Sequence, residues 1–166
     1  MSPPDEQEFR RTVGLMPSGV TVVAAFGPDG PTGATASAVC SLSLRPMLML
    51  VCLDRDSRTL GAVREAERFS INVLCIEQRP QAEMFASKAG QEEKWATVTW
   101  HGELEVPLIE GCPATVVCER GELIPAGDHV IVTGEVLEVD YDSGAAEPLV
   151  YHGGLFRTLD PARDES

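Results

Sequence analysis

The stretch "TGATASAVCSLS" at residues 32–43 carries a small side chain at nearly every position, and hydroxyl groups recur along it. It leads soon afterwards into "MLMLVCLD" at residues 47–54, a run that is apolar up to its last residue. A strand of Gly, Ala, Ser and Thr leaves its backbone N–H and C=O groups open to close approach by another backbone or by a flat ligand. An ordinary strand against a tightly packed neighbour explains the same run, and both interpretations stay open on this stretch alone.

Length and composition predict one globular domain. The chain has 166 residues, of which 43% are hydrophobic and 23% charged, and a chain of this size buries roughly 70% of its unfolded surface. The formal net charge of −13 argues against a nucleic-acid partner, because phosphate backbones are bound by clustered Lys and Arg. The same charge opposes any small anionic ligand, so a site for one must concentrate positive groups locally.

Targeting and cysteine patterns point to the cytoplasm. No apolar stretch reaches the ~18 residues of a membrane span, and the N-terminus "MSPPDEQEF" is acidic where a signal peptide is basic. The 5 cysteines are odd in number and form no Cys-x-x-Cys pair, so we expect neither a disulfide framework nor a metal site. Cys52 and Cys118 lie in apolar runs and are interpreted as buried small hydrophobes rather than catalytic thiols.

The hydrophobic pattern predicts a mainly β structure with short helices. Asp5 precedes a short amphipathic helix that ends at Pro17, and Ser57 is a good N-cap for a second helix with Leu60 and Val63 on one face. A further short helix is expected at residues 77–87. The expected strands are residues 19–27 and 32–39, which form a hairpin around "PDG", then 47–54, buried on both faces, 69–75, 97–100, 114–120, 129–141 and 149–159. Without regular β-α-β alternation, this favours a closed or partly closed antiparallel barrel.

The segment "DRDSRT" at residues 54–59 is a candidate anion site. It places Arg55 and Arg58 beside the hydroxyls of Ser57 and Thr59 at the start of a predicted helix. Backbone N–H groups and the helix dipole favour an anion at such a position, and phosphate is the expected one. A plain N-cap with solvated arginines is the alternative.

His129 begins the strand "HVIVTGEV" directly after the turn "AGD". A histidine at the rim of a barrel is placed to meet a substrate, although an exposed or structural histidine would look the same. The sequence lacks the G-x-S-x-G, H-E-x-x-H, G-x-x-x-x-G-K-[ST] and G-x-G-x-x-G patterns. Any chemistry is therefore expected to be that of a cofactor.

Taken in order, these segments resemble the flavin reductase-like family over residues 9–160. This family comprises the short-chain NAD(P)H:flavin oxidoreductases that serve as reductase components of two-component monooxygenases. The resemblance is carried by "PSGVTVVAA", "GATASAVCSLSLRPMLMLVCLDRDSRT", "FSINVL", "FASK", "EEKW", "GCPATVVCE", "AGDHVIVTGEV" and "PLVYHGGLFRTL".

The resemblance implies an FMN-binding split β-barrel, mainly β (α+β), antiparallel and Greek-key, with short peripheral helices. It implies one domain over residues 1–166 with its core at about 9–160, a homodimer, and a flavin-dependent monooxygenase as functional partner. The implied reaction is hydride transfer from NADH or NADPH to FMN or FAD. FMN is favoured because it ends at the phosphate beside Ser57, whereas FAD needs further room for an adenosine.

Matched residue by residue, the resemblance assigns flavin contacts to the small-residue run, the end of the next strand, the helix start and the "FASK" segment. These residues are Thr35, Ala36, Ser37, Ser41, Cys52, Leu53, Asp54, Ser57, Thr59, Phe85 and Lys88. His129 is the implied catalytic residue, orienting the nicotinamide without itself carrying the hydride, and Tyr151 and His152 are implied near the same face. No metal ligand is implied. Trp95 stands where relatives usually carry Phe, and Gly153-Gly154 replaces a commonly larger, often basic pair.

Two other functions fit the same residues. One is a split-barrel protein that retains its FMN for electron transfer or oxidase chemistry. The other is a non-catalytic flavin-binding module, in which case NADH would not be consumed.

Overall fold

Seven strands form a single antiparallel sheet in the order β3-β2-β6-β9-β10-β5-β4. The computed structural model describes residues 3–142, 144 and 146–159. The strands of this sheet are β2 (Thr21–Gly27), β3 (Gly30–Ala36), β4 (Val39–Leu44), β5 (Met47–Asp54), β6 (Arg68–Val73), β9 (Ala114–Ala126) and β10 (His129–Tyr141). The predicted mainly β, antiparallel class is confirmed.

The sheet curls into a split barrel. β3 and β4 follow each other in the chain but stand at opposite ends of the strand order. Because only residues 37–38 join them, the two edges of the sheet must come together at this corner. The backbone amide of Cys52 on β5 donates to the carbonyl of Ala38 at 2.9 Å and closes the corner. The predicted barrel is confirmed.

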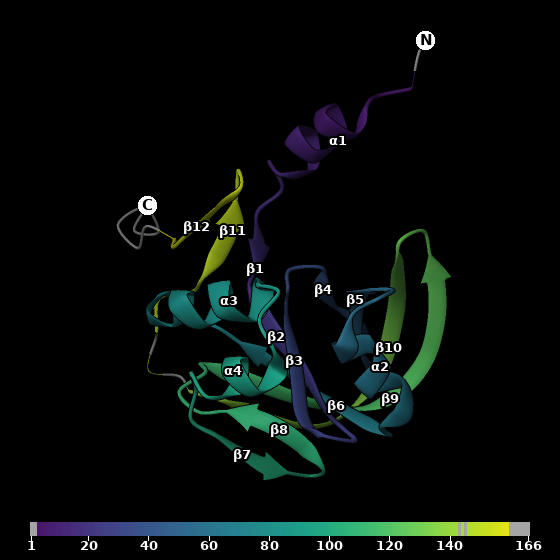
Figure 1. Cartoon of the computed structure of the whole chain (residues 1–166), viewed down its shortest axis with the longest axis vertical. Coiled ribbons are helices and arrows are strands. Elements are labelled where there is room, and N and C mark those ends of the chain that lie inside the picture. Colours follow the sequence, from purple (N-terminus) through teal and green to yellow (C-terminus); the bar gives the residue numbers. More distant parts are fainter. Residues whose placement is uncertain (1–2, 143, 145, 160–166) are drawn as a thin grey trace.

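Short helices and two small sheets surround the barrel (Figure 1). The helices are α1 (Glu6–Val13), α2 (Arg58–Glu65), α3 (Arg79–Ala86), α4 (Gln91–Trp95) and the 3₁₀ turn η1 (Ile76–Gln78). β1 (Ser18–Gly19), β11 (Val150–His152) and β12 (Leu155–Arg157) form one small sheet, and β7 (Trp100–Glu103) and β8 (Val106–Ile109) form the other. In Figure 1, α1 stands away from the body, attached through the segment that leads into β1.

Two hydrophobic clusters lie on the two sides of β2, all of whose residues from Thr21 to Ala25 are buried. Val23 and Ala25 pack with Leu60 of α2 in the barrel interior. Val22 and Ala24 pack into a second cluster that includes Phe85 and Trp95 of α3 and α4. The period of two along a strand therefore anchors α2 on one side of β2 and α3 with α4 on the other.

Gly33 on β3 allows α3 and α4 to lie directly against the sheet. A Cβ at this position would stand 2.9 Å from Cε1 of Phe85 and 3.1 Å from Cζ2 of Trp95. Both backbone polar groups of Gly33 are also bonded to the side chain of Gln91, whose Oε1 accepts from the amide at 2.8 Å and whose Nε2 donates to the carbonyl at 3.2 Å. The small-residue run thus serves close packing at Gly33.

Several sequence expectations are confirmed, and others need correction. The α1 cap at Asp5, the Ser57 cap and the bounds 129–141 of β10 are confirmed. β5 is not buried on both faces: in this single chain only Val51 and Leu53 are buried, and Cys52 is half-buried. The strand predicted at 97–100 begins only at Trp100, and the sequence pattern gave no sign of α4.

None of the helices among the described residues is long and apolar enough to cross a membrane. The limit predicted for the domain core, residue 160, lies outside the described residues.

Candidate functional site

Three segments far apart in the sequence meet at the corner where the barrel closes. The β3–β4 corner presents Ser37, which is exposed, next to the Cys52 end of β5 through the closing hydrogen bond of Ala38. Two residues further along β5, Asp54 pairs in register with His129 of β10. Ser37, Cys52, Asp54 and His129 are therefore brought to one end of the barrel, and the ligand contacts that the resemblance assigns to them stay predictions.

The loop after β5 is fastened to the β9–β10 turn and then begins α2. The Arg55 amide donates to the Asp128 carbonyl at 3.0 Å, and the Arg55 guanidinium donates to the Gly127 carbonyl. Ser57 caps α2, with its Oγ accepting from the amide of Leu60 at 3.1 Å. The first N–H groups of a helix have no partner within it, so this N-terminus offers donors and a positive dipole to an anion.

Lys94 is a buried cation near Arg58 at this helix start. It lies in the "EEKW" segment but was not among the predicted flavin contacts. The residue is 5% exposed, and its Nζ donates to the carbonyl of Phe85 at 3.0 Å. Burial lowers the pKa of Lys94 below its ordinary value, and the nearby charge of Arg58 lowers it further. Among the described residues neither Lys94 nor Arg58 forms an ion pair. Arg58 is exposed, whereas Lys94 is buried, and a buried cation without a carboxylate partner is costly unless an anion joins it.

The predicted flavin residues differ in what they can offer a ligand. Ser37, Ser41, Asp54 and Lys88 are exposed, whereas Leu53, Thr59 and Phe85 are buried in this chain. The Thr35 hydroxyl donates to the Ala82 carbonyl of α3 at 2.6 Å, and Ala36 accepts at its carbonyl from the Thr21 hydroxyl at 2.9 Å. Buried members can therefore contribute backbone groups and shape more readily than side-chain contacts, and their roles stay predictions.

His129 is held by its neighbour. Its Nδ1 lies 2.8 Å from a carboxylate oxygen of Asp128, and its side chain remains 46% exposed. This hydrogen bond lowers the pKa of the Asp128 carboxyl below its usual value. An imidazole oriented through Nδ1 presents Nε2 to a ligand, so His129 is arranged as an orienting group at the barrel rim.

A pocket of about 410 Å³ opens beside the same corner. It lies between Thr35 and Ser37, the end of α3, and the β11–β12 hairpin with Tyr151 and Phe156. Tyr151 packs edge-on against Phe156, with ring centroids 5.4 Å apart. His152, which the resemblance placed near the same face, is half-buried on β11 and does not line this pocket.

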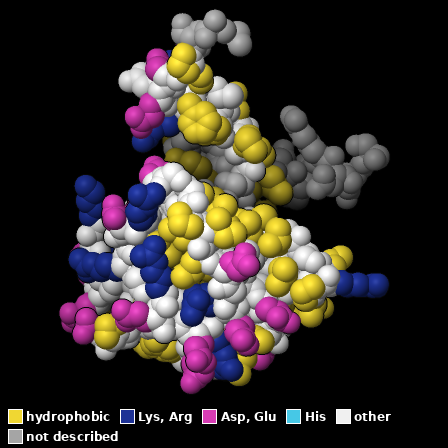
Figure 2. Space-filling view, turned by 90° about the vertical axis from the view of Figure 1, so that its right-hand side faces the viewer, with side chains coloured by type: hydrophobic (Ala, Val, Ile, Leu, Met, Phe, Trp, Pro, Cys, Tyr) yellow, Lys and Arg dark blue, Asp and Glu magenta, His cyan; other side chains and the backbone are white. Residues whose placement is uncertain are grey.

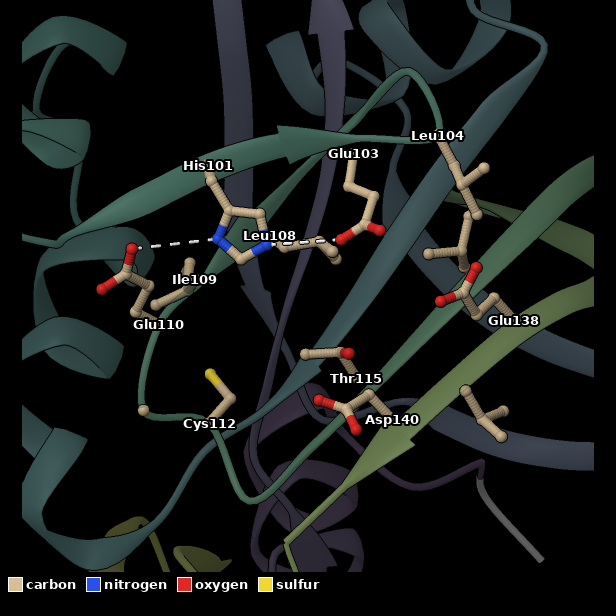
Figure 3. Close-up of a pocket in the computed structure, with 13 residues that line it drawn as sticks. His101, Glu103, Leu104, Leu108, Ile109, Glu110, Cys112, Thr115, Glu138 and Asp140 are labelled. Carbon is tan, nitrogen blue, oxygen red and sulfur yellow. Dashed lines mark ion pairs between the residues drawn. The ribbon is translucent and has the colours of Figure 1, made fainter.

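Another pocket, of about 330 Å³, lies away from this corner, between the β7–β8 hairpin and the strands β9 and β10 (Figure 3). Several titratable side chains line it. His101 lies there between Glu103 at 3.6 Å and Glu110 at 3.9 Å. Burial raises the pKa of Cys112 to about 11, which makes it a poor nucleophile. The part of the chain that the structure describes holds no group of three or more side chains suited to a metal ion. With further carboxylates on Glu138 and Asp140, this pocket repels anions.

Comparisons with known proteins agree on one family. The domain described as "Flavin reductase like domain" matches residues 13–160. The chain is 37% identical over 164 residues to the reductase component of 4-nitrophenol 4-monooxygenase/4-nitrocatechol 2-monooxygenase of Rhodococcus opacus, covering 99% of this chain and 86% of that protein. It is 36% identical over 161 residues to the NADH-dependent FMN reductase AsuE2 of Streptomyces nodosus subsp. asukaensis, covering 94% and 86%.

A solved structure shows the same fold. The NADH:FAD oxidoreductase SgcE6 of Streptomyces globisporus C-1027, in complex with NAD and FAD fragments, superposes with a TM-score of 0.90 at 33% identity. The superposition covers 99% of this chain and 98% of that one. The split-barrel architecture derived from the strand order is therefore that of known flavin reductases.

Proposed function

Because the chain belongs to the flavin reductase-like family, we propose that its single domain binds flavin at the β3–β4 corner, with the flavin phosphate at the start of α2. The protein is an NAD(P)H:flavin oxidoreductase that supplies reduced FMN or FAD to a partner monooxygenase. The observation that carries the placement is the pair of cations, Arg58 and Lys94, which have no carboxylate partner among the described residues.

The proposed flavin path has three parts: the β3–β4 corner, the end of β5 and the start of α2. Backbone groups of residues 36–38 and the exposed Ser37 line the corner for the ring edge. Cys52 and Asp54 at the end of β5 continue toward the helix start. The N-terminal turn of α2, with Arg58 and the nearby Lys94, supplies local positive charge for the flavin phosphate. Without it, the protein's net charge of −13 would repel the phosphate.

A bound flavin supplies the ring that accepts a hydride from reduced nicotinamide, so no side chain of this protein has to act as nucleophile or general acid. The protein contributes position: two flat rings must be held face to face at close range. His129, fixed by Asp128, orients the nicotinamide from the β10 side, and Tyr151 on β11 borders the pocket beside the corner.

We further propose that the protein is a homodimer in the cytoplasm, where reduced nicotinamide nucleotides are available. Support for the dimer comes from apolar surface left uncovered in one chain. Phe9 of α1 and Met16 shortly after it are 59% and 70% exposed, and Leu44 and Met47 at the β4–β5 turn are 83% and 56% exposed. Figure 2 shows hydrophobic side chains gathered on one face of the body and on the segment projecting above it. A second copy can cover both.

Anaerobic mixing with NADH and a several-fold excess of FMN tests the function. We expect the visible absorbance of the entire flavin pool to bleach, because a reductase that releases its product turns over many flavins. Bleaching limited to one flavin per protomer would instead indicate a retained flavin that passes electrons elsewhere. No bleaching despite flavin binding would leave only a flavin-binding module.

The His129→Ala variant should slow flavin reduction by about 10- to 100-fold while the flavin Kd changes less than twofold. The loss expected for an orienting group is on the order of 1.4 to 3 kcal/mol in the barrier. The measurement is stopped-flow reduction together with flavin titration. His101→Ala, in the acidic pocket of Figure 3, is the control and should leave both values unchanged. Weakened flavin binding with normal turnover would contradict the proposed role.

A further inference from the structure

A pocket of about 890 Å³ lies between α2, α4 and the β2–β3 turn. It is larger than the pocket of about 410 Å³ beside Tyr151, and it lies within the size range of small-molecule sites. Its lining includes Arg58 and Gly61 of α2, Gln91 and Trp95 of α4, residues 27–32 of the turn, and Trp100. The wall formed by α4 is fixed in place because Gln91 holds both backbone groups of Gly33.

The pocket begins where the proposed phosphate site ends. Arg58 is the first residue of α2, and the lining continues along the same helix through Gly61 to Glu65. At 1.5 Å per residue this path is about 10 Å long. A Cβ at Gly61 or at Gly90 would meet nothing within 4 Å, so the backbone leaves open space along the path. FMN stops at its single phosphate, whereas FAD continues with a second phosphate and an adenosine.

Charge along the pocket changes from positive to negative. Arg58 stands at the near end without an ion pair among the described residues. The carboxylates of Asp29, Glu65 and Glu92 stand among the remaining lining residues. Such a gradient suits a ligand with its phosphate near Arg58 and a neutral nucleoside beyond it, and it disfavours a further anionic group at the far end.

The wall of the pocket is aromatic. Trp95 and Trp100 pack edge-on with ring centroids 5.5 Å apart, and Trp100 is half-buried at the lining. Aromatic faces and edges attract purine rings.

We propose that this pocket between α2 and α4 binds the adenosine and second phosphate of FAD, so that the protein binds FAD more tightly than FMN. The proposal rests on the phosphate placement given under the proposed function. The relatives do not distinguish FMN from FAD as the preferred flavin. One at 36% identity is called an FMN reductase, and a solved structure at 33% identity is called an FAD oxidoreductase. The room for adenosine, which the sequence did not reveal, reverses the sequence-based preference for FMN.

The test is equilibrium binding of FMN and FAD to the flavin-free protein without NADH, followed by flavin fluorescence. We expect the wild type to bind FAD at least tenfold more tightly than FMN. Gly61→Phe fills the pocket and should reduce the ratio of the two Kd values to within threefold of unity. Arg64→Phe, on the same helix but outside the pocket lining, is the matched control and should keep the wild-type ratio.

A competition measurement on the wild type avoids any dependence on the variant's folding. AMP should raise the apparent Kd of FAD and leave that of FMN unchanged, because it occupies only the adenosine end. Equal or tighter binding of FMN, or competition of AMP with both flavins alike, overturns the proposal. If FMN binds and is reduced but FAD binds no more tightly than FMN, only this inference fails. If neither flavin binds, the proposed function fails with it.

Discussion

Replacing Lys94 with Met should weaken flavin binding by about 10- to 100-fold while leaving the flavin-free protein at least as stable as the wild type. A hydrogen bond to a charged partner contributes about 1.5 to 3 kcal/mol, and each 1.4 kcal/mol is tenfold in affinity. Stability should not fall because Lys94 is a buried cation, 5% exposed, whose ammonium group forms one hydrogen bond among the described residues, to the Phe85 carbonyl. Exchanging such a charge for a methionine removes a desolvation cost.

The pH dependence of binding provides a second signature of Lys94. Its pKa is lowered by burial and then by Arg58, so in the flavin-free protein it loses its proton earlier than an ordinary lysine as pH rises. A phosphate favours the charged form, so flavin affinity should fall as pH rises through this lowered pKa. For the flavin-free protein the sign is opposite: the unfolded chain binds more protons in the window between the lowered pKa and 10.5, so stability rises with pH there.

The measurements for Lys94→Met are a flavin titration from neutral to alkaline pH and thermal unfolding without flavin. Lys88→Met is the matched control, since Lys88 is an exposed lysine near the end of α3 that the family resemblance selected. If Lys94 holds the phosphate, its variant loses both affinity and the pH dependence, and the Lys88 variant changes less. A Lys94→Met protein with normal flavin affinity and a lower Tm would show that the lysine is structural only.

The burial of Lys94, unlike the position of Lys88, could not be predicted from the sequence. Lys88 is the last residue of the "FASK" segment, which the resemblance assigned to the flavin. Lys94 lies in the "EEKW" segment, to which no flavin contact was assigned, on α4, a helix of 5 residues that is too short to show a period. Its burial arises because α4 is drawn onto β3 by Gln91 and packs through Trp95 against Phe85. These are contacts between residues distant in sequence, so no local pattern could have indicated a buried cation.

Strand positions were predictable where β-branched residues stand between turn signals. The hairpin of β2 and β3 around "PDG" and the bounds of β10 are such cases. The prediction that both faces of β5 are buried was wrong for this chain. A run of apolar residues does not show whether its second face packs within the same chain. In this chain one face of β5 packs into the barrel with Val51 and Leu53, and Met47 at its start stays exposed. An apolar face of this kind is what a partner copy would bury.

The double variant Phe9→Ser/Met16→Ser should convert the proposed dimer into monomers at micromolar concentration. α1 has a capping box at Asp5 but buries no residue against its own chain, and a helix of 8 residues is not stable in water alone. Its apolar side chains therefore need a partner surface. Stable dimers bury roughly 1,200 to 2,000 Å², and removing two large apolar anchors should cost several kcal/mol of association.

Loss of the dimer should also raise the KM for NADH, since α1 is connected to the site. The Gly14 carbonyl at the end of α1 accepts from the Gly153 amide at 2.7 Å, and β1 pairs with β11, which carries Tyr151 beside the corner pocket. Light scattering after gel filtration measures the mass, and steady-state kinetics measures KM. Arg11→Ser, an exposed polar change on the same helix, is the control and should remain dimeric with an unchanged KM. A double variant that stays dimeric would place the interface elsewhere, on surfaces such as the β4–β5 turn with Leu44 and Met47.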